Sequence, residues 1–314
     1  MKLYQAPLEG ITSYIYRNAL QSVFGGVDKY FTPFISPYVK RIITNREKNQ
    51  LCPENNTNQY LVPQIMSSDA PGVRELMDWL HENYGYEEFN FNFGCPSGTV
   101  VSKGRGAGAL RDLTTLKQFL DEVMDGNPYK ISVKTRLGIR ETEEFYDVLE
   151  LYNRYQFEEI IIHPRVREEF YDGTPHMEIY QYAAKNSKNP VVYNGNLFSA
   201  SDYEAVLTNY GGISKAVMLG RGMLRNPAIF REIKGGKALT SSELEEYLRR
   251  ILDGYTEEFS GETPVLYKMK EIWVYMGEEL AANYGVDEKL LKKIKKSRHL
   301  SEYRIYEKEA LRCM

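Results

Sequence analysis

Cysteines are few in this sequence, and long apolar segments are missing. The 314 residues include three cysteines, Cys52, Cys95 and Cys313, and no Cys-x-x-Cys pair. This odd and scattered set predicts neither a disulfide framework nor a zinc site, and it suits a reducing cytoplasm. The longest apolar stretches have the length of a strand, far below the roughly 20 residues that span a bilayer. Residues 1–7 also lack the apolar region of a signal peptide, so we expect a cytoplasmic protein with no membrane segment.

An excess of one charge is missing as well. The net charge is −3, and the 42% hydrophobic and 26% charged residues are typical of a soluble globular protein. This balance excludes a chain that is basic throughout, but it allows a local basic face. Residues 289–298 contain five lysines and one arginine, with apolar residues at helical spacing. We expect an amphipathic helix there, whose lysines are either simply solvated or in contact with nucleic acid.

Two catalytic signatures are also missing. No group of histidines and carboxylates has the spacing of metal ligands, so we predict no metal. No Gly-x-Ser-x-Gly elbow of a serine hydrolase is present.

The pattern that is present alternates short strand-like segments with longer helix-like ones. Eight βα units in about 230 residues predict a TIM (β/α)8 barrel. A doubly wound sheet is the alternative, but it would carry Gly-x-Gly-x-x-Gly after its first strand, where this chain has Ala6-Pro7-Leu8-Glu9-Gly10. After residue 235 only helical segments follow. We therefore expect an α/β barrel domain, residues 1–235, and a small all-helical domain, residues 236–314. The expected strands cover residues 3–6, 29–33, 60–65, 88–92, 130–135, 158–163, 190–194 and 215–219.

Polar residues follow six successive predicted strands. Each one alone is more often structural, but the carboxyl ends of barrel strands meet at one face, where the chemistry of such folds takes place. We therefore expect one shared site. Its candidates, in chain order, are Gln64, Asn92, Cys95, Lys134, Arg136, His163, Arg165, Asn194, Gly195, Asn196, Gly220 and Arg221.

Cys95 is the most informative of these candidates. It stands between Gly94 and Pro96 at the end of an apolar, aromatic strand, which predicts a tight turn. The alternative is a buried structural cysteine, because free cysteines are among the most buried residues. The polar Asn92 and the flanking glycines favour a reactive thiol. We expect the glycine-rich residues 103–109 to form a mobile loop that closes over a ligand.

The residue types favour a flavin. Lys134 would be buried in the barrel mouth, where it needs an anion or an electron-rich ring as a partner. A lysine at the N1/O2 edge of a flavin stabilises the anion that forms on reduction. Gln64 can both donate and accept, which suits the N3/O4 edge. Gly195 and residues 220–222 offer backbone N–H groups, and Arg221 a charged fork, to a phosphate.

In their order and spacing these residues resemble the tRNA-dihydrouridine synthases, bacterial-type flavoproteins that reduce specific uridines of tRNA. The likeness covers about residues 3–232 strongly and the helical tail loosely. Its motifs are Ala6-Pro7-Leu8-Glu9-Gly10-Ile11-Thr12, Asn92-x-Gly94-Cys95-Pro96, Gly106-Ala107-Gly108-Ala109-Leu110, Lys134-x-Arg136-x-Gly138, His163-x-Arg165 with Tyr171-x-Gly173, Asn194-Gly195-Asn196, and Met218-x-Gly220-Arg221-Gly222 with Asn226-Pro227.

The resemblance implies FMN in the barrel mouth, with NADPH as its reductant. It implies that hydride passes from FMN N5 to C6 of uracil and that Cys95 donates a proton to C5. Asn92 and Arg165 match substrate-binding positions, and the helical tail matches a tRNA-binding domain. We expect a monomer with tRNA as its partner. The implied flavin contacts are Pro7, Gln64, Lys134, His163, Asn194, Gly195, Asn196, Gly220 and Arg221.

Two alternatives stay open. One is an FMN-dependent barrel that reduces a free small molecule, like an ene-reductase or a dihydroorotate dehydrogenase. The lysine-rich tail argues against it. The other is a non-catalytic RNA-binding protein that has kept an old barrel. The intact set of Cys95, Lys134 and His163 argues against that.

Overall fold

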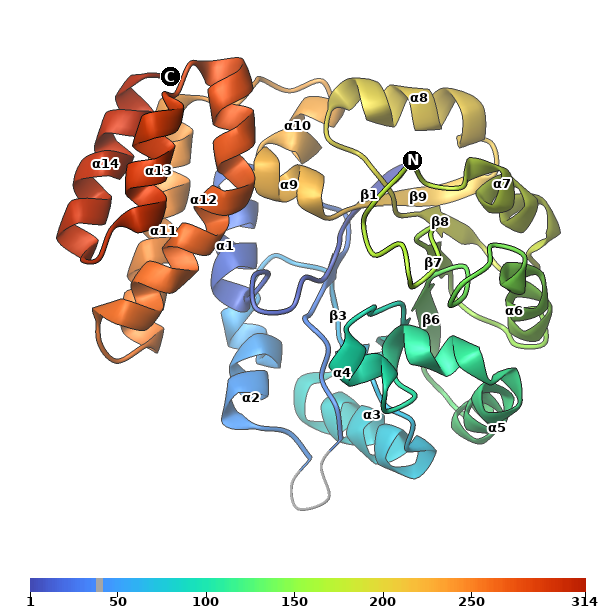
Figure 1. Cartoon of the computed structure of the whole chain (residues 1–314). Helices are drawn as coiled ribbons and strands as arrows, with labels where there is room; N and C mark the ends of the chain where they lie inside the picture. The colour runs from blue at the N-terminus through green and yellow to red at the C-terminus, as the bar shows by residue number, and fades with distance from the viewer. Residues whose placement is uncertain (38–41) are drawn as a thin grey trace. The chain divides into compact units, whose positions relative to one another are not determined.

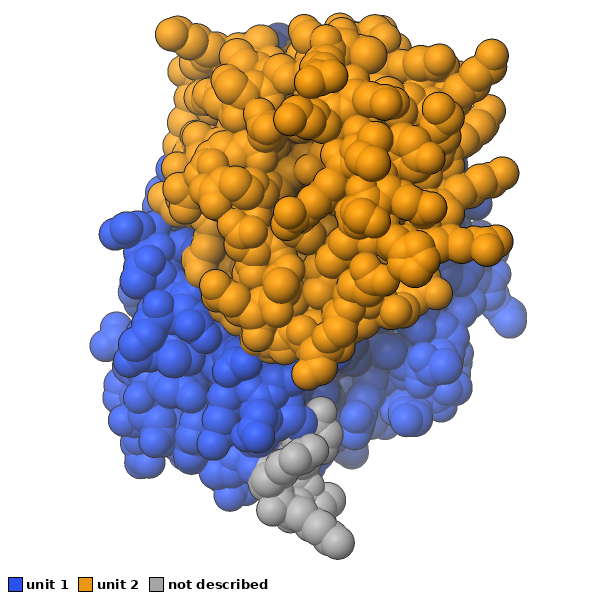
Figure 2. Space-filling model, turned by 90° about the vertical axis from the view of Figure 1, so that its left-hand side faces the viewer, with its two compact units in different colours: residues 1–7, 28–196, 204–219 blue, residues 8–27, 197–203, 220–314 orange. Residues whose placement is uncertain are grey.

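The computed structural model describes residues 1–37 and 42–314 of the chain. These residues form two compact units, which Figure 2 shows in blue and orange. The first unit comprises residues 1–7, 28–196 and 204–219, and the second comprises residues 8–27, 197–203 and 220–314.

The first unit is built on a curled parallel sheet of seven strands, surrounded by helices (Figure 1). The strand order is β1-β9-β8-β7-β6-β5-β4, and every neighbouring pair is parallel. The strands are β1 (Lys2–Gln5), β4 (Gln64–Ile65), β5 (Glu88–Phe93), β6 (Lys130–Thr135), β7 (Ile160–Ile162), β8 (Val191–Tyr193) and β9 (Ser214–Leu219).

A short strand pair closes the sheet into the predicted barrel. β2 (Tyr30–Phe31) pairs with β3 (Leu61–Val62), and isolated bridges join Tyr4 to Lys29 and Ile35 to Ile65, at the two edges of the large sheet. The predicted strand 60–65 is therefore divided into β3 and β4, on either side of Pro63. The TIM-barrel fold is confirmed, with this interruption.

The inner face of the barrel changes character along the strands. Alternate residues of a strand share a face, so Glu159, Ile161 and His163 all point inward. Glu159 lies at the strand starts, where the Lys29 ammonium contacts its carboxylate at 2.9 Å and that of Glu88 at 2.7 Å. A charged layer, an apolar middle and a polar rim at the strand ends follow from this spacing. The apolar middle consists of Tyr4, Ala6, Phe31, Val62, Ile161, Val192, Ala216 and Met218.

Helices cover the outer face of the sheet. The outward Phe91 and Phe93 of β5 pack on Phe119 of α5 (Leu113–Met124), with ring centroids 5.9 and 6.2 Å apart. The remaining helical elements are α2 (Asn45–Leu51), η1 (Pro53–Asn55), α3 (Ala70–Tyr84), α4 (Gly98–Val101), η2 (Gly106–Arg111), α6 (Glu144–Tyr152) and α7 (Met177–Asn186). α8 (Ala200–Tyr210) contributes residues to both units.

The second unit is helical. The predicted helices after residue 235 are present as α11 (Ser241–Glu258), α12 (Glu262–Tyr284) and α13 (Glu288–Lys296), and α14 (Leu300–Arg312) follows them. The unit also contains α9 (Arg221–Arg225), α10 (Ile229–Ile233) and α1 (Tyr14–Val23), which packs on α11. The predicted functional boundary at residue 235 stays a prediction.

Candidate active site

The predicted site residues of the first unit lie at the carboxyl ends of neighbouring strands. Asn92 of β5 pairs in register with Lys134 of β6, and Gln64 of β4 pairs with Asn90. In parallel strands, residues in register share a face, so these side chains converge inside the barrel mouth. His163 and Asn194 follow β7 and β8 directly and continue the same rim.

Asn92 fixes the turn that carries Cys95. Its Oδ1 accepts hydrogen bonds from the backbone N–H of Gly94 at 3.0 Å and of Cys95 at 2.9 Å. Such a side-chain bond to the following backbone substitutes for the strand ladder that ends here. The Cys95 thiol is partly exposed and forms no disulfide. Cys95 is therefore not a buried structural cysteine, and the reactivity of its thiol stays a prediction.

The glycine-rich segment differs from the predicted mobile loop. Residues 106–111 form a 3₁₀ helix, and Gly106 and Gly108 are buried. Gly106 has a φ of +55°, and a Cβ there would lie 2.8 Å from the Cys95 carbonyl oxygen. Ala107 donates its backbone N–H to that same oxygen at 3.0 Å. The glycines therefore allow close packing beneath Cys95, and the expectation of a closing loop is not what the structure shows.

A chain of buried amides supports Asn92 from below. Asn92 Nδ2 donates to Gln64 Oε1 at 2.8 Å, and Gln64 Nε2 donates to Asn90 Oδ1 at 2.8 Å. Asn90 Nδ2 in turn donates to Ser132 Oγ at 2.9 Å. The sequence analysis missed Asn90 and Ser132. Their signal is the strict alternation of Glu88-Phe-Asn-Phe-Asn-Phe93, in which the polar residues face inward.

The Lys134 side chain belongs to the same rim, on the strand β6. Among the described residues its ammonium has no hydrogen-bond or ion-pair partner. Burial lowers the pKa of Lys134 to about 7, the charge of Arg136 adds to the lowering, and the nearby Cys95 opposes it. An anionic or electron-rich ligand would stabilise the protonated form. The donor set around Lys134 thus fits a ligand of the predicted kind.

His163 is held in one tautomer by Arg165. Arg165 Nη1 lies 2.9 Å from His163 Nε2, and because a guanidinium can only donate, Nε2 must be the acceptor and the ring hydrogen sits on Nδ1. Arg165 is fully buried and also donates to the carbonyl oxygens of Asp172 and Gly173 and to Asn196 Oδ1. These contacts favour a positioning role for Arg165. Its predicted contact with the substrate stays a prediction.

Two further arginines, absent from the predicted contacts, hold the Cys95 turn. Arg136 Nε donates to the Gly94 carbonyl oxygen at 3.0 Å, and Arg167 Nε donates to the Pro96 carbonyl oxygen at 3.1 Å. The carbonyl groups on both sides of Cys95 are therefore bound by arginines that belong to the following loops. Sequence spacing marks Arg136 as a polar residue at a strand end, but it does not reveal this contact.

The remaining predicted contacts of the first unit lie at the ends of β1 and β8. Asn194 is buried, and its Nδ2 donates to the Met218 carbonyl oxygen at 2.9 Å, which joins β8 to β9. A Cβ on Gly195 would lie 2.0 Å from the Tyr193 hydroxyl, so any larger residue there would displace the Tyr193 side chain. Pro7 is half-buried just after β1.

Gly220 and Arg221 belong to the second unit, where α9 begins. Gly220 is the residue before the helix, and the Arg221 guanidinium lies 5.5 Å from the ring centroid of Phe198. A Cβ on Gly222 would lie 1.9 Å from the Leu197 carbonyl oxygen, so α9 starts in very close contact with the segment 197–198.

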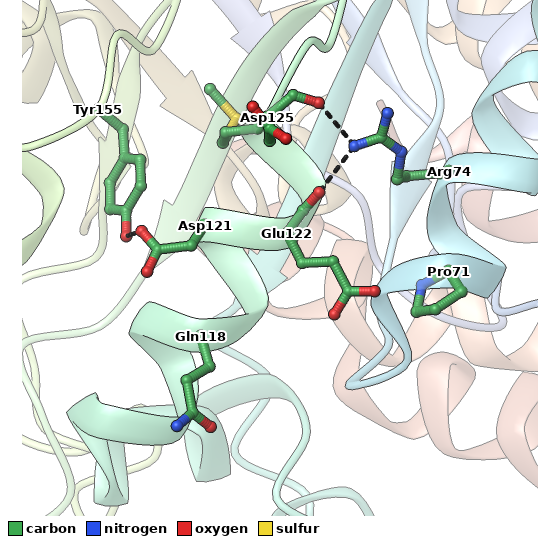
Figure 3. A pocket seen from close by; sticks show the side chains of 8 residues that line it. Pro71, Arg74, Gln118, Asp121, Glu122, Asp125 and Tyr155 are labelled. Carbon is green, nitrogen blue, oxygen red and sulfur yellow. Dashed lines mark hydrogen bonds between the residues drawn. The ribbon is translucent and has the colours of Figure 1, made fainter.

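A groove elsewhere in the first unit is a different feature (Figure 3). It is lined by side chains of α3 and α5, and Arg74 Nη1 donates to the carbonyl oxygens of Glu122 and Asp125 at 2.8 and 2.6 Å. These contacts cap the end of α5, which leads into the start of β6. Neither Cys95 nor any other residue of the predicted site lines this groove.

Within residues 1–37 and 42–314, no helix combines the length and apolarity needed to cross a bilayer. The same residues contain no cluster of three or more histidine, cysteine or carboxylate side chains that could hold a metal ion.

Comparison with known sequences decides the family. A family model described as Dihydrouridine synthase (Dus) matches residues 4–309. The chain belongs to the dihydrouridine synthase family. This match confirms the resemblance carried by the motifs at the strand ends, and it extends into the helical second unit of the chain.

Curated relatives cover most of the chain. A "Probable tRNA-dihydrouridine synthase" of Helicobacter pylori (strain ATCC 700392 / 26695) is 26% identical over 287 residues, which are 90% of this chain and 84% of the relative. A "tRNA-dihydrouridine(16) synthase" of Pseudomonas syringae pv. tomato is 28% identical over 272 residues, 79% of this chain and 81% of the relative.

A solved structure agrees with the fold of this chain. Histamine dehydrogenase from Rhizobium sp. 4-9 superposes with a TM-score of 0.55 at 12% identity, over 79% of this chain and 49% of that chain. Similarity at this level shows the barrel fold alone.

Proposed function

We propose that this protein reduces the C5–C6 double bond of specific uridines in tRNA to 5,6-dihydrouridine, with bound FMN as the redox cofactor and NADPH as the reductant. The observation that carries the proposal is the partly exposed Cys95 thiol, on a turn fixed by Asn92, beside Lys134, whose ammonium has no partner among the described residues. Membership of the dihydrouridine synthase family and the printed names of the curated relatives support it.

The residues that would hold FMN are those of the barrel rim. Lys134 would bind the electron-rich edge of the ring, because its charged form gains from an anionic partner. Gln64 keeps one amide N–H for a ligand after its two contacts with Asn92 and Asn90. The bound flavin would supply the hydride. The remaining proposed contacts are Pro7, His163, Asn194, Gly195, Asn196, Gly220 and Arg221.

Cys95 would donate the proton to C5 of the uracil. A proton donor must be protonated before the reaction and must be held within hydrogen-bond reach of the carbon's π system. The two backbone bonds to Asn92 provide that fixed position. A uridine reaches a site inside a barrel only when it leaves its stack, so the target base must flip out of the RNA.

Asn92 has a structural task that its predicted role did not include. The oxygen and the nitrogen of its side-chain amide both contact protein. Oδ1 accepts from the backbone N–H of Cys95, and Nδ2 donates to Gln64 Oε1. One N–H remains for the uracil. We propose that Asn92 contacts the base while it positions the thiol, and that Arg165 acts through His163.

Basic side chains in both units would bind the tRNA phosphates. In the first unit Lys103, Arg105 and Arg167 lie close in sequence or space to the Cys95 turn. In the second unit α13 buries Leu290, Leu291 and Ile294 and exposes its lysines, as the sequence predicts. A hollow beside α13 is lined by Lys289, Lys292, Lys293, Lys296 and Arg298, together with Tyr306 of α14.

The proposal is tested with the purified protein, NADPH and an unmodified tRNA transcript. We expect a yellow protein that binds FMN and forms dihydrouridine, detected by nucleoside mass spectrometry, but leaves free uridine unchanged. The affinity of the protein for tRNA should decrease steeply as the salt concentration rises, because the protein releases counterions from the phosphates when it binds. Reduction of a free small molecule without reaction on tRNA would favour the alternative FMN-dependent reductase. A colourless protein that binds tRNA without turnover would favour a non-catalytic RNA-binding protein.

A further inference from the structure

Phe170 is an exposed aromatic residue in an unfavourable backbone conformation. It is 42% exposed and has a φ of +49°, in the left-handed region that non-glycine residues avoid. Neither property helps the fold, since burial of the ring or a glycine at this position would be more favourable. Conformations of this kind persist where the surroundings enforce them, and they cluster at functional sites.

Two arginines enforce this conformation. Arg136 Nη2 donates to the Phe170 carbonyl oxygen at 2.6 Å. The Arg167 guanidinium lies over the Phe170 ring, 5.0 Å from its centroid. One arginine thus fixes the backbone of Phe170, and the other covers one face of its ring while much of the side chain stays exposed.

The same two arginines bind the carbonyl groups on either side of Cys95. Arg136 contacts Gly94, and Arg167 contacts Pro96. The position of the Phe170 ring is therefore coupled to the position of the thiol through side chains of fixed geometry. An aromatic ring whose place relative to a catalytic turn is fixed in this way is suited to align a planar group with that turn.

Arg167 also keeps donors for a ligand. Its Nε is used by Pro96, and the guanidinium forms no ion pair with any of the described residues. Arg140 in the neighbouring loop, in contrast, is paired with Glu168 at 3.2 Å. An exposed ring beside an unpaired guanidinium matches a nucleotide, with a base for the ring and a phosphate for the fork.

We propose that Phe170 and Arg167 form a nucleotide platform at the active site. The Phe170 ring stacks on a base next to the target uridine, and Arg167 binds an adjacent phosphate. The platform rests on the proposed function, in that its ligand is the RNA substrate. It gives the enzyme a contact with the neighbouring nucleotide that is sequence-tolerant, because every base has a π face.

The test uses Phe170→Gly, Phe170→Trp and Arg167→Lys in the full-length holoprotein. Phe170→Gly removes the ring and also the backbone strain, so the unfolding temperature should stay equal or rise. We expect the Kd for unmodified tRNA transcript and the KM to rise about tenfold, with a smaller change in kcat. Phe170→Trp should restore most of the affinity, because a larger ring stacks at least as well. Arg167→Lys should weaken tRNA binding, because lysine lacks the two parallel donors of the guanidinium. The salt dependence of the Kd should stay the same, because the charge is kept.

Tyr182→Ala is the matched control. Tyr182 is 40% exposed in the same unit and pairs with Tyr146 on the barrel exterior. Its removal should leave tRNA affinity unchanged. An unchanged Kd for Phe170→Gly, with dihydrouridine still formed, would overturn the platform and leave the proposed function standing. Phe170-dependent tRNA binding by a protein that forms no dihydrouridine would support the platform and refute the proposed function.

Discussion

Cys95 and Lys134 owe their chemistry to their immediate neighbours. The thiol stays partly exposed because its turn is bound by Asn92 and by Arg136, and not because the chain there is loose. Lys134 stands in register with Asn92 on the next strand, without a partner of its own among the described residues. In the proposed function, Cys95 would give a proton and Lys134 would bind a negative ligand.

We predict that Cys95→Ala separates the two halves of the reaction. The variant should retain FMN and its reduction by NADPH, because the thiol is not among the proposed flavin contacts. Dihydrouridine formation should fall by about two to four orders of magnitude, the usual contribution of a positioned acid. Flavin absorbance in stopped flow measures the first half, and nucleoside mass spectrometry the second. Full turnover by Cys95→Ala would remove the thiol from the mechanism.

The lowered pKa of Lys134 predicts a pH dependence of FMN affinity. In the free protein its pKa is about 7, so the ammonium is mostly lost above that pH. A negative ligand binds the protonated form better and raises this pKa. Affinity should therefore be highest below pH 7 and decrease by up to about tenfold per pH unit above it. Titration of flavin fluorescence at several pH values measures this. Lys134→Arg stays charged, and an equally steep profile in that variant would assign the dependence to another group.

At the scale of elements, close packing replaces the mobility that the glycines suggested. The segment 106–111 is a 3₁₀ helix placed directly beneath the Cys95 turn. Its glycines were visible in the sequence, but glycine permits both a flexible loop and a close approach of two backbones. The position of the Cys95 carbonyl group decides between a flexible loop and close packing. That position is set by the strand β5 and its partners.

Gly106→Ala and Gly104→Ala form a matched pair. Both glycines have a positive φ, +55° and +67°, so either substitution should cost about 1–2 kcal/mol of folding free energy. A Cβ at 106 would also lie 2.8 Å from the Cys95 carbonyl oxygen, whereas a Cβ at 104 meets nothing within 4 Å. We predict that Gly106→Ala lowers kcat at least tenfold and that Gly104→Ala leaves it nearly unchanged. Equal kcat values for the two variants would contradict the packing argument.

The strands and the polar residues at their ends could be predicted from the sequence, because their signals are local. Strict alternation in residues 88–93 and residue types at each strand end are properties of the chain itself. The contacts that orient these residues are not. Arg136 and Arg167 reach carbonyl groups roughly 40 and 70 positions earlier in the chain, and nothing in their own surroundings indicates such a partner. α14 lies within the expected helical domain 236–314, but its bounds were not predicted, because its surface is charged and its apolar face is narrow.

At the scale of the whole molecule, the barrel carries a charged network at one end and the candidate site at the other. Lys29 holds Glu88 and Glu159 together at the strand starts, and Tyr60 and Tyr4 donate to the same two carboxylates. A network with every member satisfied lets three charged groups lie inside the barrel. It stabilises the scaffold whose opposite ends carry the site.

We predict that Lys29→Met lowers the stability of the first unit by about 3–5 kcal/mol, because it leaves Glu88 buried without a cation and Glu159 with Lys215 alone, at 3.4 Å. Lys117→Met is the control, since Lys117 is paired with Asp121 on the exposed surface of α5. That change should stay within about 1 kcal/mol. Urea unfolding followed by tryptophan fluorescence and by circular dichroism measures both. A Lys29→Met protein as stable as the parent would show that the network is dispensable.

The packing partner of α1 could not be predicted from the sequence. The segment 8–27 reads as part of the barrel by its position in the chain, yet α1 packs with α11 in the second unit, where Tyr16 meets Tyr247 at 5.9 Å between ring centroids. The partner of an amphipathic helix is decided by surfaces more than 200 residues away, which no local window contains.

The central claim is tested most directly by nucleoside mass spectrometry of tRNA from cells in which the gene is deleted and then restored. The account predicts that dihydrouridine disappears at a defined tRNA position on deletion, returns with the wild-type gene, and does not return with Cys95→Ala. Unchanged dihydrouridine at every position, in a strain without overlapping relatives, would contradict it.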